Sequence, residues 1–173
     1  MKTIFTAVAI CLFLAHSGYA QEPCTRHTEA AGRFSYCPPT GWGSKDSTSS
    51  PYKTFLSASG ATPRANTNVR EEATTLSHND YVAAALKYLF AGQGTGNVQS
   101  VKVVGWTDFT TDSKLRGTRL VYETVYSGGL LHTVQYMFDR PGKKLIVTGT
   151  AGATDKAAAD VIFDNMLKTL RTF

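Results

Sequence analysis

Residues 114–151 form the stretch that most constrains what this chain can fold into. They read KLRGTRLVYETVY, SGG, LLHTVQYMF, DRPGKK and LIVTGTA in turn, so three runs rich in Val, Tyr, Thr and Leu are separated by two breaks that contain glycine. Such runs are typical of β-strands, and short glycine-bearing breaks are typical of hairpin turns. The stretch therefore predicts a three-stranded antiparallel meander, and it carries no recognisable reaction motif.

The first turn of this meander sets the expected register. With Gly128 and Gly129 as the central residues of the turn, Glu123 is predicted to face Val134 across the two strands. Alternation along the strands then gives both faces of the sheet many apolar side chains. A sheet of this kind needs cover on both sides, and helices are the expected cover. A loop longer by one residue would move every side chain to the opposite face.

The remaining elements are predicted from the same kinds of pattern. Further strands are expected at residues 33–37, 52–58, 66–74 and 98–110, and the small polar residues 43–50 predict a loop. One helix is expected to begin after Ser77 and to stop at Gly92, and a second is expected from Lys156 to about Arg171. The predicted fold class is α+β, with an antiparallel sheet of about six to seven strands covered by helices.

The first twenty residues have the pattern of a signal peptide. Lys2 gives a basic start, residues 4–15 are apolar, and Gly18-Tyr19-Ala20 form a small-residue cleavage site. We expect cleavage near Ala20, export to the periplasm or the medium, an N-terminal extension at residues 21–32 and a single domain at residues 33–173. A lipid anchor on Cys11 is the competing interpretation of the leader, and no later stretch is long and apolar enough for a transmembrane helix.

Two cysteines remain after the leader, Cys24 and Cys37. An exported protein with two cysteines usually pairs them, so a structural disulfide is predicted. The spacing fits neither a CxxC redox pair nor a zinc site, and no HxxxH or HExxH pattern occurs. The sequence therefore predicts no metal site and gives no sign of a cofactor.

Arg119, Glu123 and His132 are the polar residues that stand out, because the alternation places them on one otherwise apolar face of the meander. Half-buried charges must be paired or hydrated, so this set is a candidate binding site for an anionic or polar ligand, or an acid/base group. The alternative is a cross-strand salt bridge with a histidine near the sheet edge. No catalytic residue is assigned, since a GxSxG elbow is absent as well.

The formal net charge of the whole sequence is +5 at pH 7. The charged residues are scattered, and no run of five residues has one sign. A basic arm for nucleic acid is therefore not expected, and the sequence says nothing about oligomeric state.

Four segments of the chain resemble the superfamily of the photosystem protein PsbP and the periplasmic protein DcrB. They are FSYCPPTGW at residues 34–42, SxxDY at residues 77–81, LIVTGTA at residues 145–151 and LKTLRTF at residues 167–173. The resemblance implies an antiparallel sheet between helical layers, an α/β/α sandwich. It also implies an extracytoplasmic accessory or partner-binding protein, because the family has no common catalytic residue.

Three functions are therefore compared. The first is a non-catalytic accessory protein that binds a protein partner in the periplasm or cell envelope. The second is a carrier of a small apolar ligand or lipid, and the third is a hydrolase that works through His132 and Glu123. An exposed apolar patch would favour the first, an enclosed apolar pocket the second, and a histidine in a cleft the third.

Overall fold

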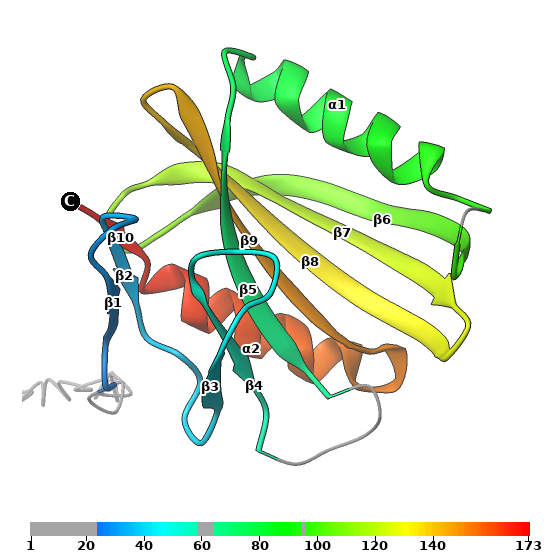
Figure 1. The fold of residues 1–173 in the computed structure, drawn as a ribbon, viewed down its shortest axis with the longest axis horizontal. Helices are drawn as coiled ribbons and strands as arrows, with labels where there is room; N and C mark the ends of the chain where they lie inside the picture. The colour runs from blue at the N-terminus through cyan, green and yellow to red at the C-terminus, as the bar shows by residue number, and fades with distance from the viewer. Residues whose placement is uncertain (1–23, 59–63, 95) are drawn as a thin grey trace, which may run out of the picture.

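A seven-stranded antiparallel sheet forms the centre of the molecule in a computed structural model that describes residues 24–58, 64–94 and 96–173 (Figure 1). The order of its strands is β3-β4-β5-β9-β8-β7-β6. They are β3 (Gly43–Asp46), β4 (Lys53–Leu56), β5 (Asn66–Ala73), β6 (Val98–Thr110), β7 (Arg116–Tyr126), β8 (Gly129–Arg140) and β9 (Lys143–Gly152). The predicted α+β class, with a sheet of this size, is confirmed.

A second, small sheet joins the two ends of the described chain. Its strands are β1 (His27–Glu29), β2 (Phe34–Tyr36) and β10 (Arg171–Thr172), in the order β1-β2-β10. Both outer strands are antiparallel to β2. Strand β1 lies within the segment that the sequence analysis treated as an N-terminal extension.

The meander is present, but its first turn is displaced from the predicted position. Strands β7 and β8 pair with Tyr126 opposite Gly129, and Glu123 lies opposite His132 and not opposite Val134. The predicted register was therefore wrong by two residues, because the SGG segment offers two neighbouring positions for a two-residue turn. A shift of two residues keeps every side chain on its predicted face, since the period of a strand is two.

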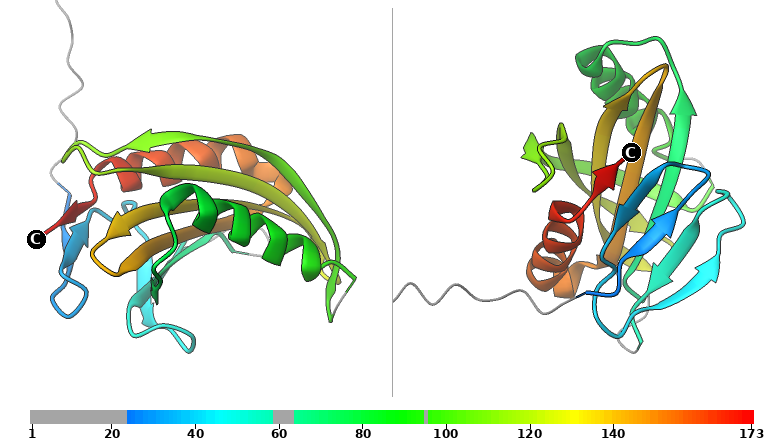
Figure 2. Two further views of the ribbon diagram at one scale, coloured as in Figure 1. Left: turned by 90° about the horizontal axis from the view of Figure 1, so that it is seen from above. Right: turned by 90° about the vertical axis from the view of Figure 1, so that its left-hand side faces the viewer.

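One helix covers each face of the large sheet (Figure 2). Helix α1 (His78–Ala91) begins where the sequence predicts, with the Asp80 N–H donating to the hydroxyl of the N-cap Ser77 at 3.2 Å. A single 3₁₀ turn, η1 (Ala153–Asp155), leads from β9 into helix α2 (Lys156–Lys168). The sandwich of helix, sheet and helix is thus formed by two helices of similar length.

The cores on the two faces differ greatly in size. Helix α2 and the small sheet bury a large core against one face, including Phe34, Tyr136, Phe138 and Phe163. Only five buried residues form the core on the α1 face, where Tyr81 and Val82 of the helix meet three side chains of the sheet. The other residues of α1 are exposed or half-buried. This helix is therefore held mainly through its first half.

Two segments differ from the sequence-based prediction. Strand β3 forms within residues 43–50, where a loop was predicted, because it pairs with β4 through its backbone. All four of its residues are exposed. Helix α2 ends at Lys168 and not near Arg171. The hydroxyl of Thr169 donates to the carbonyl of Met166 at 2.6 Å, and the chain then leaves the helix to pair with β2.

A disulfide joins Cys24 to Cys37, as predicted, with the two Cα atoms 5.7 Å apart. It ties the start of the described chain to the end of β2. The predicted signal peptide at residues 1–20 lies outside the described residues. Among the residues that are described, none of the helices is long and apolar enough to cross a membrane.

Candidate functional site

The predicted polar set lies on the sheet face that α2 covers. Nε2 of His132 is 2.9 Å from Oδ1 of Asp160, and Nη2 of Arg119 is 2.7 Å from the same oxygen. Glu123 is directed to Lys156, with Oε1 and Nζ 3.1 Å apart. The structure thus brings all three residues to the contact between sheet and helix, but it gives Arg119 and His132 one partner and Glu123 another.

A second carboxylate extends the same network. Nε of Arg119 donates to Oδ1 of Asp164 at 2.8 Å, and the hydroxyl of Tyr136 donates to the same oxygen. Burial and the bond to Asp164 raise the pKa of Tyr136. For Arg119, burial lowers the pKa, but the hydrogen bond and charge of Asp164 outweigh burial, so the net direction is upward. Tyr136 and Arg119 therefore keep their protons. They donate hydrogen bonds to the carboxylates of Asp160 and Asp164, which act as the acceptors of the network.

These contacts account for the polar set as an attachment of α2 to the sheet. The side chain of His132 is only 3% exposed, and its Nδ1 is buried without a hydrogen-bond partner in the part of the chain that the structure describes. This arrangement favours the tautomer that carries its proton on Nε2 and donates to Asp160. An imidazole enclosed in this way has no ring nitrogen that a substrate can reach. The ligand-binding role of Arg119, Glu123 and His132 stays a prediction.

Asp160 and Asp164 were not among the predicted site residues, although the sequence contains a signal for them. The two aspartates are four residues apart on α2, so they share one side of the helix. They border the buried stripe of α2, which consists of Ala159, Phe163, Met166 and Leu167. Carboxylates beside such a stripe indicate a cationic partner on the covered face, and Arg119 was the predicted half-buried cation on that face.

A groove lies on the opposite side of the sheet, beneath the second half of α1. It consists of two adjoining cavities of about 540 and 490 Å³, which share Tyr88, Leu89 and Tyr122 as lining residues. We call it the α1 groove and define it by Arg70, Glu72, Tyr81, Ala84, Ala85, Tyr88, Leu89, Ala91, Gly92, Val98, Val101, Tyr122, Thr124 and Gln135. It exists because α1 is buried only near its start.

The two ends of the α1 groove differ in polarity. At one end the hydroxyl of Tyr81 donates to Glu72, whose other carboxylate oxygen is 2.9 Å from Nη2 of Arg70. Burial and the bond to Glu72 raise the pKa of Tyr81. The other end, between the last turn of α1 and the start of β6, is formed mainly by apolar side chains such as Leu89 and Val98.

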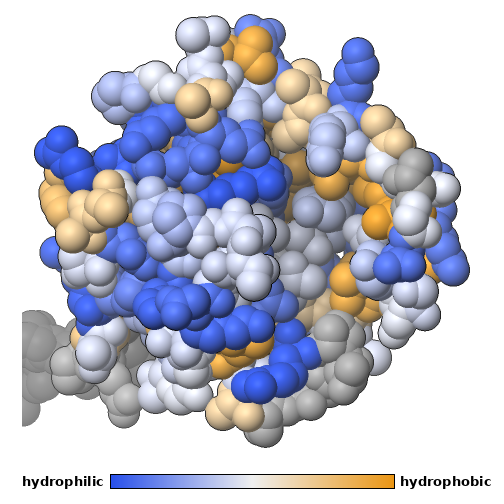
Figure 3. Space-filling view, in the orientation of Figure 1, coloured by the Kyte–Doolittle hydropathy of each residue, from blue (hydrophilic) through white to orange (hydrophobic). Residues whose placement is uncertain are grey.

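Exposed apolar and aromatic side chains occur around the apolar end of the groove. Tyr88 is 81% exposed and Phe90 is 51% exposed at the end of α1, while Tyr126, on the α1 face of the sheet, is exposed at the β7–β8 turn. Apolar surface gathers on the side of the molecule where α1 and β7 end and β6 begins (Figure 3). Aromatic groups left in water around a groove are typical of a surface that another molecule covers.

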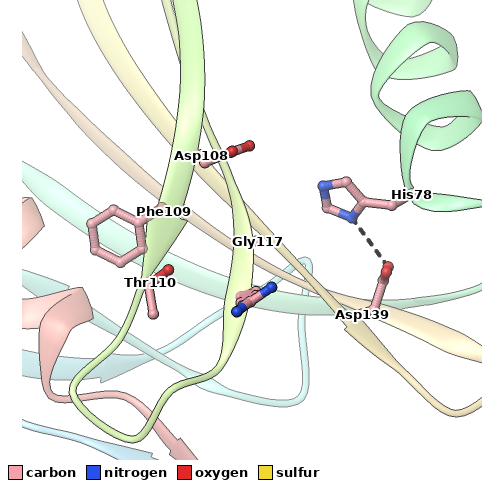
Figure 4. A pocket seen from close by; sticks show the side chains of 7 residues that line it. His78, Asp108, Phe109, Thr110, Gly117 and Asp139 are labelled. Carbon is pink, nitrogen blue, oxygen red and sulfur yellow. Dashed lines mark hydrogen bonds and ion pairs between the residues drawn. The ribbon is translucent and has the colours of Figure 1, made fainter.

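A third cavity, of about 370 Å³, lies at the start of α1, between the β6–β7 and β8–β9 hairpins (Figure 4). His78 forms one side of it, with Nδ1 3.2 Å from Oδ1 of Asp139 and Nε2 2.7 Å from Oγ1 of Thr118. Burial raises the pKa of Asp139, but hydrogen bonds from Lys144 and His78 outweigh it and lower that pKa overall. Asp108 and Arg116 also line this cavity.

A hydroxyl, an imidazole and a carboxylate thus stand in a row, as in a hydrolytic triad. The bond between the Thr118 hydroxyl and the imidazole is the contact that such a triad needs, but Thr118 is only 6% exposed. A nucleophile needs open space for the carbonyl that it attacks. The row therefore joins α1 to two strands and is a weak candidate for catalysis. Within the described residues, no three His, Cys, Asp or Glu side chains are placed to hold a metal ion.

Comparison with solved structures shows what this architecture is similar to. The solution structure of cyanobacterial PsbP (CyanoP) from Synechocystis sp. PCC 6803 matches with a TM-score of 0.65 and 13% identity, over 90% of this chain and 96% of that one. The fold is PsbP-like. No family model and no curated protein matches the sequence.

The PsbP-like fold recurs in two further matches. LpqN, described as involved in cell envelope biogenesis of Mycobacterium tuberculosis, has a TM-score of 0.62 and 12% identity, over 87% of this chain and 86% of that one. PA94, a protein of unknown function from Pseudomonas aeruginosa, has a TM-score of 0.57 and 18% identity, over 76% of this chain and 97% of that one. Identities this low establish a shared fold and carry no residue roles to this chain.

Proposed function

We propose that this protein is an exported, non-catalytic accessory protein of the periplasm or cell envelope, and that it binds a partner protein through the α1 groove. The observation that carries the proposal is the groove itself, which α1 leaves open and which is surrounded by exposed aromatic residues. The leader pattern, the Cys24–Cys37 disulfide and the fold shared with an envelope protein support export.

The composition of the groove fits a protein partner. Tyrosine is enriched in protein interfaces because it offers a large rigid surface and a hydroxyl at its tip. Tyr81, Tyr88 and Tyr122 all line the groove, and Arg70 and Glu72 close one end with a charged pair. An apolar, aromatic segment of a partner would bury its side chains against Tyr88 and Leu89, and its polar atoms would meet the charged pair.

A carrier of an apolar ligand is the second candidate, and the volume of the two joined cavities favours it. Sites for small ligands range from about 300 to 1,000 Å³ and enclose most of the ligand. The α1 groove has the volume but is open along one side. A partner protein would cover that open side, whereas a small apolar ligand would remain partly in water, so the partner is preferred. A hydrolase acting through His132 and Glu123 has no comparable support, because His132 is buried against Asp160.

A groove-filling substitution tests the proposal. Ala85→Trp puts an indole into the α1 groove, and Ala157→Trp puts the same side chain on the exposed side of α2 as a matched control. A photo-cross-linking residue at position 88, used in the producing cell, reports on the partner. We expect one discrete cross-linked protein, lost with Ala85→Trp and kept with Ala157→Trp. Identical cross-linking in all three proteins would overturn the assignment of the groove.

Native mass spectrometry of the protein purified from its own compartment separates the two candidates. A bare oxidised chain, together with a discrete cross-link, supports a protein partner. A lipid-sized mass that is lost on denaturation and is absent from Ala85→Trp would establish the carrier instead.

A further inference from the structure

The cavity at His78 lies where two hairpins separate. Paired residues of β7 and β8 run as far as Gly117 and Phe138, and the next two positions would place Arg116 opposite Asp139. Opposite charges at facing positions of neighbouring strands usually form an ion pair. Here the strands diverge, Asp139 is bonded to His78 and Lys144, and the cavity occupies the fork.

Two exposed charged side chains around this cavity have no partner among the residues that the structure describes. Asp108 and Arg116 lie on the same face of the β6–β7 hairpin, at diagonal positions, since Asp108 pairs with Thr118 and Arg116 pairs with Thr110. Diagonal positions are within reach of long side chains. Within the described residues, neither Asp108 nor Arg116 makes a side-chain hydrogen bond or an ion pair, whereas Asp139 makes two of each. In the close-up the Asp108 and Asp139 carboxylates approach the imidazole of His78 from different sides (Figure 4).

The charges of the lining select a class of ligand. Lys144 balances Asp139, so the unbalanced groups are one carboxylate at Asp108 and one guanidinium at Arg116. Both residues are exposed, so water solvates them in the free protein. A ligand of one charge would pair with only one of the two groups and would be repelled by the other. A ligand that carries both signs would pair both groups, and guanidinium groups hold carboxylates in a planar two-bond geometry.

We propose that this fork is a binding site for a small zwitterion that carries an ammonium group and a carboxylate, such as a free α-amino acid. The carboxylate binds Arg116, and the ammonium group donates to Asp108 and to the free oxygen of Asp139. His78 positions Asp139 and closes the site beside α1. The cavity volume of about 370 Å³ suits a ligand of this size. The site is separate from the α1 groove and does not depend on the partner-binding proposal.

The test is an NMR titration of the purified protein, followed through the backbone amides of Asp108 and Gly117. The probes are glycine, L-alanine and L-phenylalanine as zwitterions, and acetate and methylammonium as the two half-ligands. We expect saturable shifts with at least one amino acid, and binding about tenfold weaker or more with either half-ligand, because each half-ligand loses one charge-assisted contact.

Substitutions within the same hairpin give matched controls. Asp108→Asn and Arg116→Gln should each weaken binding by about tenfold, while Asp112→Asn and Lys114→Gln change the same charges outside the cavity and should leave it unchanged. The proposal is overturned if none of the amino acids gives a saturable shift at about 10 mM. It is also overturned if acetate binds as well as the amino acids do, or if the control substitutions weaken binding as much as Asp108→Asn.

Discussion

Gly149 of β9 and Phe163 of α2 approach so closely that a β-carbon on Gly149 would lie 2.6 Å from the Phe163 ring. The ring itself is fully buried, and it also meets Trp42 edge-on with the ring centroids 6.2 Å apart. The absence of a side chain at position 149 therefore sets how closely α2 can pack on the sheet.

Gly149→Ala should destabilise the protein by about 1–3 kcal/mol, because the added methyl group must displace a buried ring from a packed core. Chemical denaturation of the two proteins measures the difference. Gly43→Ala is the matched control, since a β-carbon there meets no atom within 4 Å. Equal losses in both variants would show that the backbone freedom of glycine, and not the contact with Phe163, is responsible.

The attachment of α2 gives a second prediction. Asp160→Asn should lower the free energy of unfolding by about 1–2 kcal/mol, because Arg119 and His132 both lose a charged acceptor. Glu123→Gln should change it by less than about 0.5 kcal/mol, since Lys156 is exposed and such pairs contribute little. Thermal and denaturant unfolding of both variants check the difference.

The binding role predicted for the same residues makes a separate expectation. If Arg119, Glu123 and His132 form a binding site, Glu123→Gln and His132→Ala should abolish an interaction that Ala157→Trp leaves intact. The same cross-linking assay, with the photo-cross-linking residue moved from position 88 to the exposed position 161 on α2, measures this. If both variants keep every interaction, the binding role is ruled out, and the three residues serve only to attach α2 to the sheet.

Glu71 predicts how stability depends on pH. Its carboxylate accepts hydrogen bonds from Tyr52 at 2.7 Å, Arg140 at 2.8 Å and Lys143 at 2.8 Å. Burial raises the pKa of Glu71, but the bonds from Lys143 and Tyr52 outweigh it, so the folded-state pKa lies below the unfolded one. Such a group contributes stability above its unfolded pKa and loses it as the pH falls through its folded pKa.

The stability difference between the native protein and Glu71→Gln should therefore be largest near about pH 6 and should shrink toward about pH 3. Urea unfolding at a series of pH values measures it. Asp46→Asn, whose side chain is 90% exposed and paired only with Lys53, is the control and should show a much smaller pH dependence. A constant difference for Glu71→Gln across the series would contradict the assignment.

The disulfide gives a fifth prediction. Replacing Cys24 and Cys37 with serine should cost about 3 kcal/mol, because the bond closes a loop with a sequence separation of 13 in the unfolded chain. Chemical denaturation of the double variant and of the native protein under reducing conditions should give the same midpoint. Complete reduction of the native protein is confirmed by its mass. If the denaturation midpoint of the native protein then stays unchanged, packing around Cys37, and not the disulfide, holds the start of the described chain in place.

The faces of the meander could be predicted from the sequence, because alternation depends only on the period of a strand. Arg119, Glu123 and His132 were placed together correctly on that basis. The register could not be fixed, since Ser127-Gly128 and Gly128-Gly129 are both acceptable turn centres. Strand β3 gave no signal either, because an edge strand with four exposed side chains has no apolar period.

The candidate sites were less predictable than the fold, for a physical reason. Each depends on where two elements fail to pack or pair. The α1 groove results from a helix that is fully buried only near its start. The fork at Arg116 and Asp139 results from strands that diverge one residue pair earlier than their charges would suggest. Alternation and helical stripes describe contacts that form, so they give no sign of such gaps.

Strand β2 lies between β1 and β10, so both ends of the described chain leave from one corner of the molecule. The apolar end of the α1 groove is at the far end of the long strands from this corner (Figure 1). An immobilising tag at Phe173 would therefore hold the protein at one pole and leave the groove facing outward. Surface-capture experiments can use this end of the chain, and a fluorescent fusion there would report on binding without obstructing it.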